Sequence, residues 1–103
     1  MVAATWVPDE SLTDNTGAVL PRYLWAVLDC PGAYAFPEPA TGAILLGELA
    51  VAIKGIVSGG EKCVVTGWEI KQEGRKHYTG TALFGATGAC RAVGYATWFE
   101  VSV

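Results

Sequence analysis

The chain has 103 residues, of which 51% are hydrophobic and 17% are charged, and its net charge is −3. This length fits a single domain, residues 1–103, with one core. The seven Lys and Arg residues are scattered, which excludes the basic stripe that nucleic-acid binding requires but not a small anionic ligand. So much apolar sequence in so short a chain predicts self-association as a homodimer or homotetramer.

Cysteine and histidine usage limits the chemistry further. Cys30, Cys63 and Cys90 show no CxxC spacing, as expected of free thiols in a reducing compartment. One histidine in the chain argues against a metal site. Residues 1–10 lack the pattern of a signal peptide, and the apolar stretches are too short to span a bilayer. We therefore expect a cytoplasmic location and no membrane partner.

The first part of the chain predicts a strand, a loop and a buried helix. Residues 2–7 are β-branched and aromatic before Pro8, and residues 9–17 are rich in turn formers. Pro21 suits the first turn of a helix that continues to residue 36. One helical stripe carries Leu24, Val27, Leu28, Pro31 and Ala35. Apolar residues also cover most of the remaining circumference, which predicts a helix buried on all sides.

The second part of the chain changes to a strand pattern. Strands are predicted at residues 44–57, 62–72, 76–84 and 91–103, with turns at 58–60, 73–74 and 85–88. Sequential hairpins would make these strands an antiparallel meander. Glycines within them fit a strongly bent sheet. The fold class is therefore α+β, a curled antiparallel sheet around one central apolar helix.

This order of elements resembles the hotdog superfamily, most clearly the phenylacetate-pathway and 4-hydroxybenzoyl-CoA type thioesterases. In those proteins an Asn- and Gly-rich turn leads into His-Gly-Gly at the helix start, and a catalytic carboxylate follows about two turns later. Here Asn15-Thr16-Gly17 precedes Leu20-Pro21-Arg22, and Asp29 stands at the carboxylate position. The run from 74 to 101 also looks like the final thioesterase hairpin, whose strands line the acyl-CoA site.

Two features depart from that pattern. Leu20 replaces the histidine, and Pro21-Arg22 replaces the glycine pair. The family uses the first glycine N–H to polarise the thioester carbonyl, but Pro21 has no N–H. The N–H of Arg22 or Tyr23 would have to do this instead, or the site is altered or inactive. The chain also begins directly on its first strand, so a minimal or truncated member is expected.

Asp29 is the only charged residue between Arg22 and Glu38. Burial of an unpaired carboxylate is costly, so a buried Asp has either a donor or a function. Trp25 lies one helical turn earlier, and an indole there suits a general base. The alternative is a structural carboxylate paired with a cation, such as Arg22. The residues alone leave both open, and the resemblance favours the catalytic role.

The remaining candidate residues are substrate contacts. Arg75, Lys76 and His77 are the single basic cluster, which would hold the phosphates of coenzyme A or simply form a solvated hairpin end. As a catalytic residue His77 has no obvious carboxylate partner in the sequence. The other candidate contacts are Asn15, Trp25 and Thr79. No cofactor is expected beyond coenzyme A as part of the substrate.

Three functions are compatible with these residues. The first is hydrolysis of an acyl-CoA or acyl-carrier thioester, with Asp29 as general base or nucleophile. The second is a non-catalytic acyl-ligand binder that has lost the oxyanion donor, which Pro21 favours. The third is a purely structural dimerisation domain, which leaves Asp29 unexplained.

Overall fold

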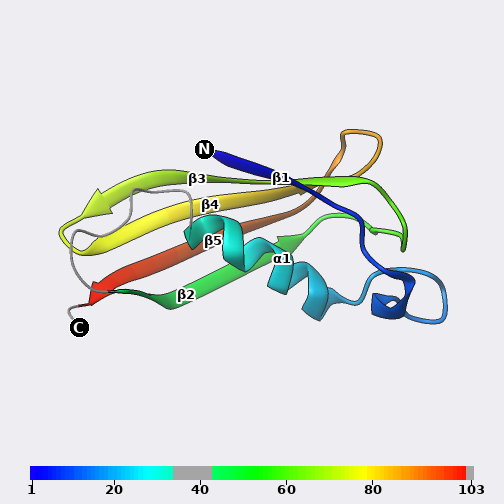
Figure 1. Cartoon of the computed structure of the whole chain (residues 1–103), viewed down its shortest axis with the longest axis horizontal. Helices are drawn as coiled ribbons and strands as arrows, with labels where there is room; N and C mark the ends of the chain where they lie inside the picture. Colours follow the sequence, from blue (N-terminus) through cyan, green and yellow to red (C-terminus); the bar gives the residue numbers. More distant parts are fainter. Residues whose placement is uncertain (34–42, 102–103) are drawn as a thin grey trace.

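The computed structural model describes residues 1–33 and 43–101 of the chain. Its elements in chain order are β1 (Val2–Trp6), the 3-10 helix η1 (Glu10–Leu12), α1 (Pro21–Ala33), β2 (Ala43–Ile53), β3 (Cys63–Glu73), β4 (Lys76–Phe84) and β5 (Cys90–Val101). The strands form one antiparallel sheet in the order β1-β3-β4-β5-β2, and α1 lies across one face (Figure 1). The predicted α+β class is therefore confirmed. No helix among these residues is long and apolar enough to cross a bilayer.

The predicted apolar stripe of α1 packs on the concave face of the sheet. Leu24 and Leu28 are buried in the main core, with Val27 packed against it. Burial of one leucine contributes about 1.5–3 kcal/mol, so this stripe is a main source of stability. Ala35, also assigned to the stripe, lies outside the described residues, as does the predicted end of the helix at 36.

The expectation that α1 is buried on all sides is wrong. Trp25 keeps 40% of its surface exposed, and Pro21 and Ala26 are also exposed. A single sheet covers one side of the helix only, because it lies as one layer against it (Figure 1). These apolar residues of α1 are thus open to solvent in one copy of the chain.

A glycine in β3 lets the helix approach the sheet closely. A Cβ atom at Gly67 would meet the Pro31 carbonyl oxygen at 2.6 Å, and this oxygen belongs to the rigid helix backbone. Only glycine fits such an approach without displacing the helix. Gly67 therefore fixes the C-terminal half of α1 against β3.

The predicted meander is wrong in the position of its first strand. β2 pairs with β5 at the edge of the sheet and not with β3. It also ends at Ile53, before the predicted Val57, because the N–H groups of Lys54 and Gly55 both donate to the Arg91 carbonyl. The chain then passes the loop before α1, where the Val19 N–H donates to the Val57 carbonyl at 2.7 Å. A segment anchored there cannot form the tight hairpin that the glycines at 59 and 60 suggest.

Candidate active site on the flank of the helix

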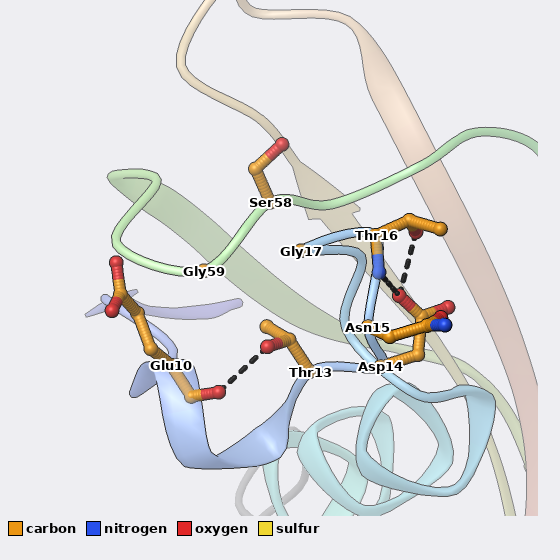
Figure 2. A pocket seen from close by; sticks show the side chains of 8 residues that line it. All are labelled: Glu10, Thr13, Asp14, Asn15, Thr16, Gly17, Ser58 and Gly59. Atoms are coloured by element: carbon orange, nitrogen blue, oxygen red, sulfur yellow. Dashed lines mark hydrogen bonds between the residues drawn. The ribbon is translucent and has the colours of Figure 1, made fainter.

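The loop before α1 is shaped by one carboxylate. Asp14 accepts hydrogen bonds from the N–H and hydroxyl of Thr16, at 2.8 and 2.6 Å (Figure 2). It also accepts one from the N–H of Ala18. The bonds from Thr16 hold the pKa of Asp14 below its usual value. The chain then returns along η1, where the Leu20 N–H donates to the Leu12 carbonyl. These contacts set the point at which α1 begins.

The first turn of α1 offers fewer free donors than the sequence predicts. Pro21 has no N–H, and the Tyr23 N–H already donates to the Leu20 carbonyl at 3.0 Å. Among the described residues, nothing accepts a hydrogen bond from the Arg22 N–H. The Arg22 guanidinium lies over the Tyr23 ring at 5.0 Å. Of the two predicted oxyanion donors, Arg22 is therefore the one left available.

Asp29 lies on the side of α1 that faces β2. The Pro31 carbonyl approaches Gly67 of β3, whereas Gly32 approaches Thr79 of β4 and Trp98 of β5. Each residue turns the helix by about 100°, so this step shows the direction of rotation across the sheet. Leu28 faces Gly94 of β5, and one further step in the same direction carries Asp29 past β5 toward β2. We call this side of α1, with Arg22, Trp25 and Asp29, the β2 flank.

The Asp29 carboxylate is half-buried and has no hydrogen-bond or ion-pair partner among the described residues, 1–33 and 43–101. Its alternative role as a partner of Arg22 therefore receives no support from the described contacts. Trp25 is one turn earlier on the same flank and is exposed.

One copy of the chain does not bring the two parts of the predicted site together. Arg22 and Asp29 are seven residues apart on one helix, which separates them by about 10 Å along its axis. A carbonyl group accepting from the Arg22 N–H would then be out of reach of the Asp29 carboxylate. The arrangement requires a second copy if both groups act on one thioester.

The predicted basic cluster is divided between the two faces of the sheet. The Lys76 ammonium lies over the Phe99 ring at 5.5 Å on the convex face, and Arg75 is exposed at the hairpin tip. His77 points to the concave face instead and is 3% exposed. Thr79 is also buried there, and its hydroxyl accepts a hydrogen bond from the Trp98 indole at 3.1 Å.

His77 has two carboxylate partners that the sequence alone did not predict. Glu69 and Glu100 each lie 2.8 Å from one of its ring nitrogens. They are 8 and 23 residues away along the chain, and only the pairing of β3, β4 and β5 brings them to the same place. Alternation along each strand could have predicted the face of the sheet on which Glu69 and Glu100 lie, but not that they contact His77.

Asn15 lines a polar pocket. The loop between η1 and α1, which carries Asn15, lies at the opposite end of the molecule from the β3–β4 hairpin (Figure 1). The pocket has a volume of about 560 Å³, and its lining residues are Glu10, Thr13, Asp14, Asn15, Thr16, Gly17, Ser58 and Gly59. The Asn15 side chain turns away from Glu10 (Figure 2). With two carboxylates and no cation in this lining, the pocket is unsuited to a phosphate group.

Neither a family model nor a curated protein matches the sequence. Solved structures do match the fold. The E. coli PaaI protein, from the phenylacetic acid degradation operon, has a TM-score of 0.87 at 11% identity, over 97% of this chain and 72% of that one. The Streptococcus mutans protein smu.793, bound to acetyl CoA, gives 0.86 at 11%, over 98% and 81%. A Thermus thermophilus thioesterase complexed with coenzyme A and zinc gives 0.84 at 11%, over 97% and 78%.

Proposed function

From the hotdog fold of this chain, we propose that it hydrolyses the thioester of an acyl-CoA or acyl-carrier substrate with Asp29 as general base or nucleophile. The observation that carries this proposal is the half-buried carboxylate of Asp29, which has no partner among the described residues and lies on the β2 flank. Proteins of the same fold hold coenzyme A or acetyl CoA, which supports this class of substrate.

The reaction needs few groups. As general base, Asp29 takes a proton from a water molecule, whose oxygen attacks the thioester carbonyl carbon. As nucleophile, it attacks that carbon itself, and water then hydrolyses the resulting anhydride. In both cases the C–S bond breaks, the thiol leaves with a proton, and the fatty or aromatic acid is released. The carbonyl oxygen carries negative charge in between, and a helix N-terminus with a free N–H stabilises it.

We propose that two copies of the chain build each site. The Arg22 N–H of one copy would bind the carbonyl oxygen, and Asp29 of the other would act on the carbonyl carbon. β2 is the strand for this association, because it is an edge strand next to the β2 flank and carries exposed Leu45, Leu46 and Ile53. An exposed apolar edge strand readily pairs with another chain.

Fewer residues remain candidates for substrate contacts than the sequence predicted. Arg75 and Lys76 remain candidates for the phosphates of coenzyme A, and Trp25 for a wall of the acyl site. His77 and Thr79 are themselves buried and already have hydrogen-bond partners within the chain, so we do not extend the proposal to them. Asn15 remains a candidate only if a second copy brings its loop near the β2 flank.

A non-catalytic acyl-ligand binder is the second candidate function. Pro21 and the engaged N–H of Tyr23 favour it, since they remove two donors from the helix start. A panel of short, long and aromatic acyl-CoA thioesters separates the two functions when the released thiol is trapped and thermal unfolding is followed in parallel. We expect turnover of at least one thioester. Stabilisation by one of them without any turnover would establish the binder instead.

Sedimentation equilibrium should show a homodimer at micromolar concentration. Leu46→Lys on β2 should weaken the dimer, because it places a charge on the associating edge. Val64→Lys is a matched control: Leu46 and Val64 are 39% and 41% exposed, but Val64 lies on β3, inside the sheet order. A stable wild-type monomer, or equal weakening by both variants, would contradict association through β2.

A further inference from the structure

Three ionisable side chains meet at one end of the concave face. His77 of β4 lies between Glu69 of β3 and Glu100 of β5, with Nδ1 to Glu69 Oε2 and Nε2 to Glu100 Oε2 both 2.8 Å. The imidazole is 3% exposed, and each carboxylate remains partly open to solvent. We call Glu69, His77 and Glu100 the clasp. It is separate from the β2 flank and from the proposed hydrolysis.

The register of the strands explains why these residues meet. His77 faces Trp98 across β4 and β5, and Glu69 faces Thr79 across β3 and β4. A bulge between Glu69 and Lys71 shifts the pairing, so that Gln72 stands directly opposite His77 and Glu69 reaches the ring from the position opposite Thr79. The clasp thus ties three strands together at the end where the β3–β4 hairpin lies (Figure 1).

The geometry requires a charged histidine. An ionised carboxylate can only accept hydrogen bonds, so two of them at the two ring nitrogens need both nitrogens to be donors. Only the imidazolium form provides that. Burial by itself lowers the pKa of His77, but the hydrogen bonds and charges of Glu69 and Glu100 outweigh it and raise the pKa.

The described charged groups at neighbouring positions of β3 and β4 lie on the opposite face of the sheet. Lys71 and Lys76 lie over Tyr78 and Phe99 on the convex face, and Glu73 pairs with Lys71 there. α1 contributes its C-terminal end, since Gly32 lies against Thr79, two residues from His77 along β4. The carbonyl groups of a helix C-terminus favour a nearby cation. Asp29, the described carboxylate of α1, lies one turn before that end on the β2 flank.

We propose that the clasp is a pH-sensitive latch: protonated His77 joins β3 and β5 across β4 and holds the C-terminal end of α1 on the sheet, and loss of its proton releases them. Without the proton, two carboxylates face each other across a neutral ring. At most one can then keep its hydrogen bond, and the other faces a nitrogen lone pair. Repulsion between them would separate the strand ends.

The direction of the pH effect follows from the raised pKa of His77. In the opened state the histidine returns to its ordinary value of about 6.5. The latch is therefore fully closed below that pH. Between that value and the higher pKa of the closed state, the ratio of closed to open molecules falls about tenfold per pH unit, and above it the ratio is constant. Alkaline pH therefore opens the latch.

His77 is the only histidine in the chain, so an NMR titration of imidazole resonances in the intact protein reports on the clasp alone. We expect a pKa above 6.5 for wild type, and a lower one in both Glu69→Gln and Glu100→Gln. Glu73→Gln is the matched control, because it removes a carboxylate of the same strand that pairs with exposed Lys71. It should leave the His77 titration unchanged.

Amide hydrogen exchange, corrected for its intrinsic pH dependence, measures the opening itself. Protection should fall in the window above pH 6.5 at the ends of β3 and β5 and in the last turn of α1, and remain at β1. His77→Gln should abolish this pH dependence, and Glu73→Gln should retain it. A pKa at or below 6.5 in wild type, or protection that does not change with pH, would overturn the proposal. Loss of protection equally at β1 would indicate global unfolding and also overturn it.

Discussion

The Asp29→Asn variant should lose at least a hundredfold in kcat/KM for every thioester that wild type cleaves. Asparagine keeps the shape of the side chain but cannot accept a proton as a base or form an anhydride. Removal of a general base typically costs about 10²–10⁴ in rate. The assay is thiol release from acyl-CoA under conditions where wild type turns over.

Stability distinguishes this catalytic role from a structural one. No described residue is paired with Asp29. The asparagine variant therefore leaves no described cation without its ion-pair partner, and its melting temperature should change little. A salt-bridged Asp29 would behave in the opposite way: the melting temperature would fall and kcat/KM would follow the folded fraction. Asp14→Asn is the matched control, since Asp14 accepts several bonds in the loop before α1. It should lower stability more than Asp29→Asn does. Hydrolysis by Asp29→Asn at the wild-type rate would exclude Asp29 from the reaction.

Mixing two inactive variants should restore activity if the site is shared between copies. Arg22→Pro removes the N–H that remains available in the first turn of α1, where proline is tolerated, and Asp29→Asn removes the carboxylate. In a mixed dimer one site combines Arg22 of one copy with Asp29 of the other, and both are intact there. After equilibration of equal amounts, half of the dimers are mixed and each has one working site. Activity should therefore return to roughly a quarter of wild type.

Recovery of activity in the mixed dimer depends on whether Arg22 and Asp29 of one site belong to the same copy or to different copies. A site built within one copy has no intact combination in the mixed dimer, so no recovery would refute the shared site. Arg22→Ala is the control for the backbone donor, because it removes the side chain and keeps the N–H. It should retain most of the activity at saturating substrate, and circular dichroism should show that Arg22→Pro keeps its helix. A loss in Arg22→Ala as large as in Arg22→Pro would assign the effect to the guanidinium instead.

The sequence by itself determined the local elements and the core stripe. Helical spacing identified Leu24 and Leu28 as buried residues, and Pro21 marked the first residue of α1. The turn at 73–74 was also predictable, because Gly74 adopts a φ of +60° that side chains disfavour. These features depend on periodicity and on the conformational range of single residues, which a stretch of sequence carries within itself.

Only the tertiary structure decided which elements became neighbours. Nothing in the pattern of residues 44–57 distinguished a strand beside β3 from one beside β5, because alternation specifies the face of a strand and not its partner. The same holds for His77, whose carboxylate partners come from two other strands. The β2 flank likewise exists only once Pro31 and Gly32 are placed against β3 and β5. Residues distant along the chain meet through packing of the whole sheet, and that packing is a property of all the strands together.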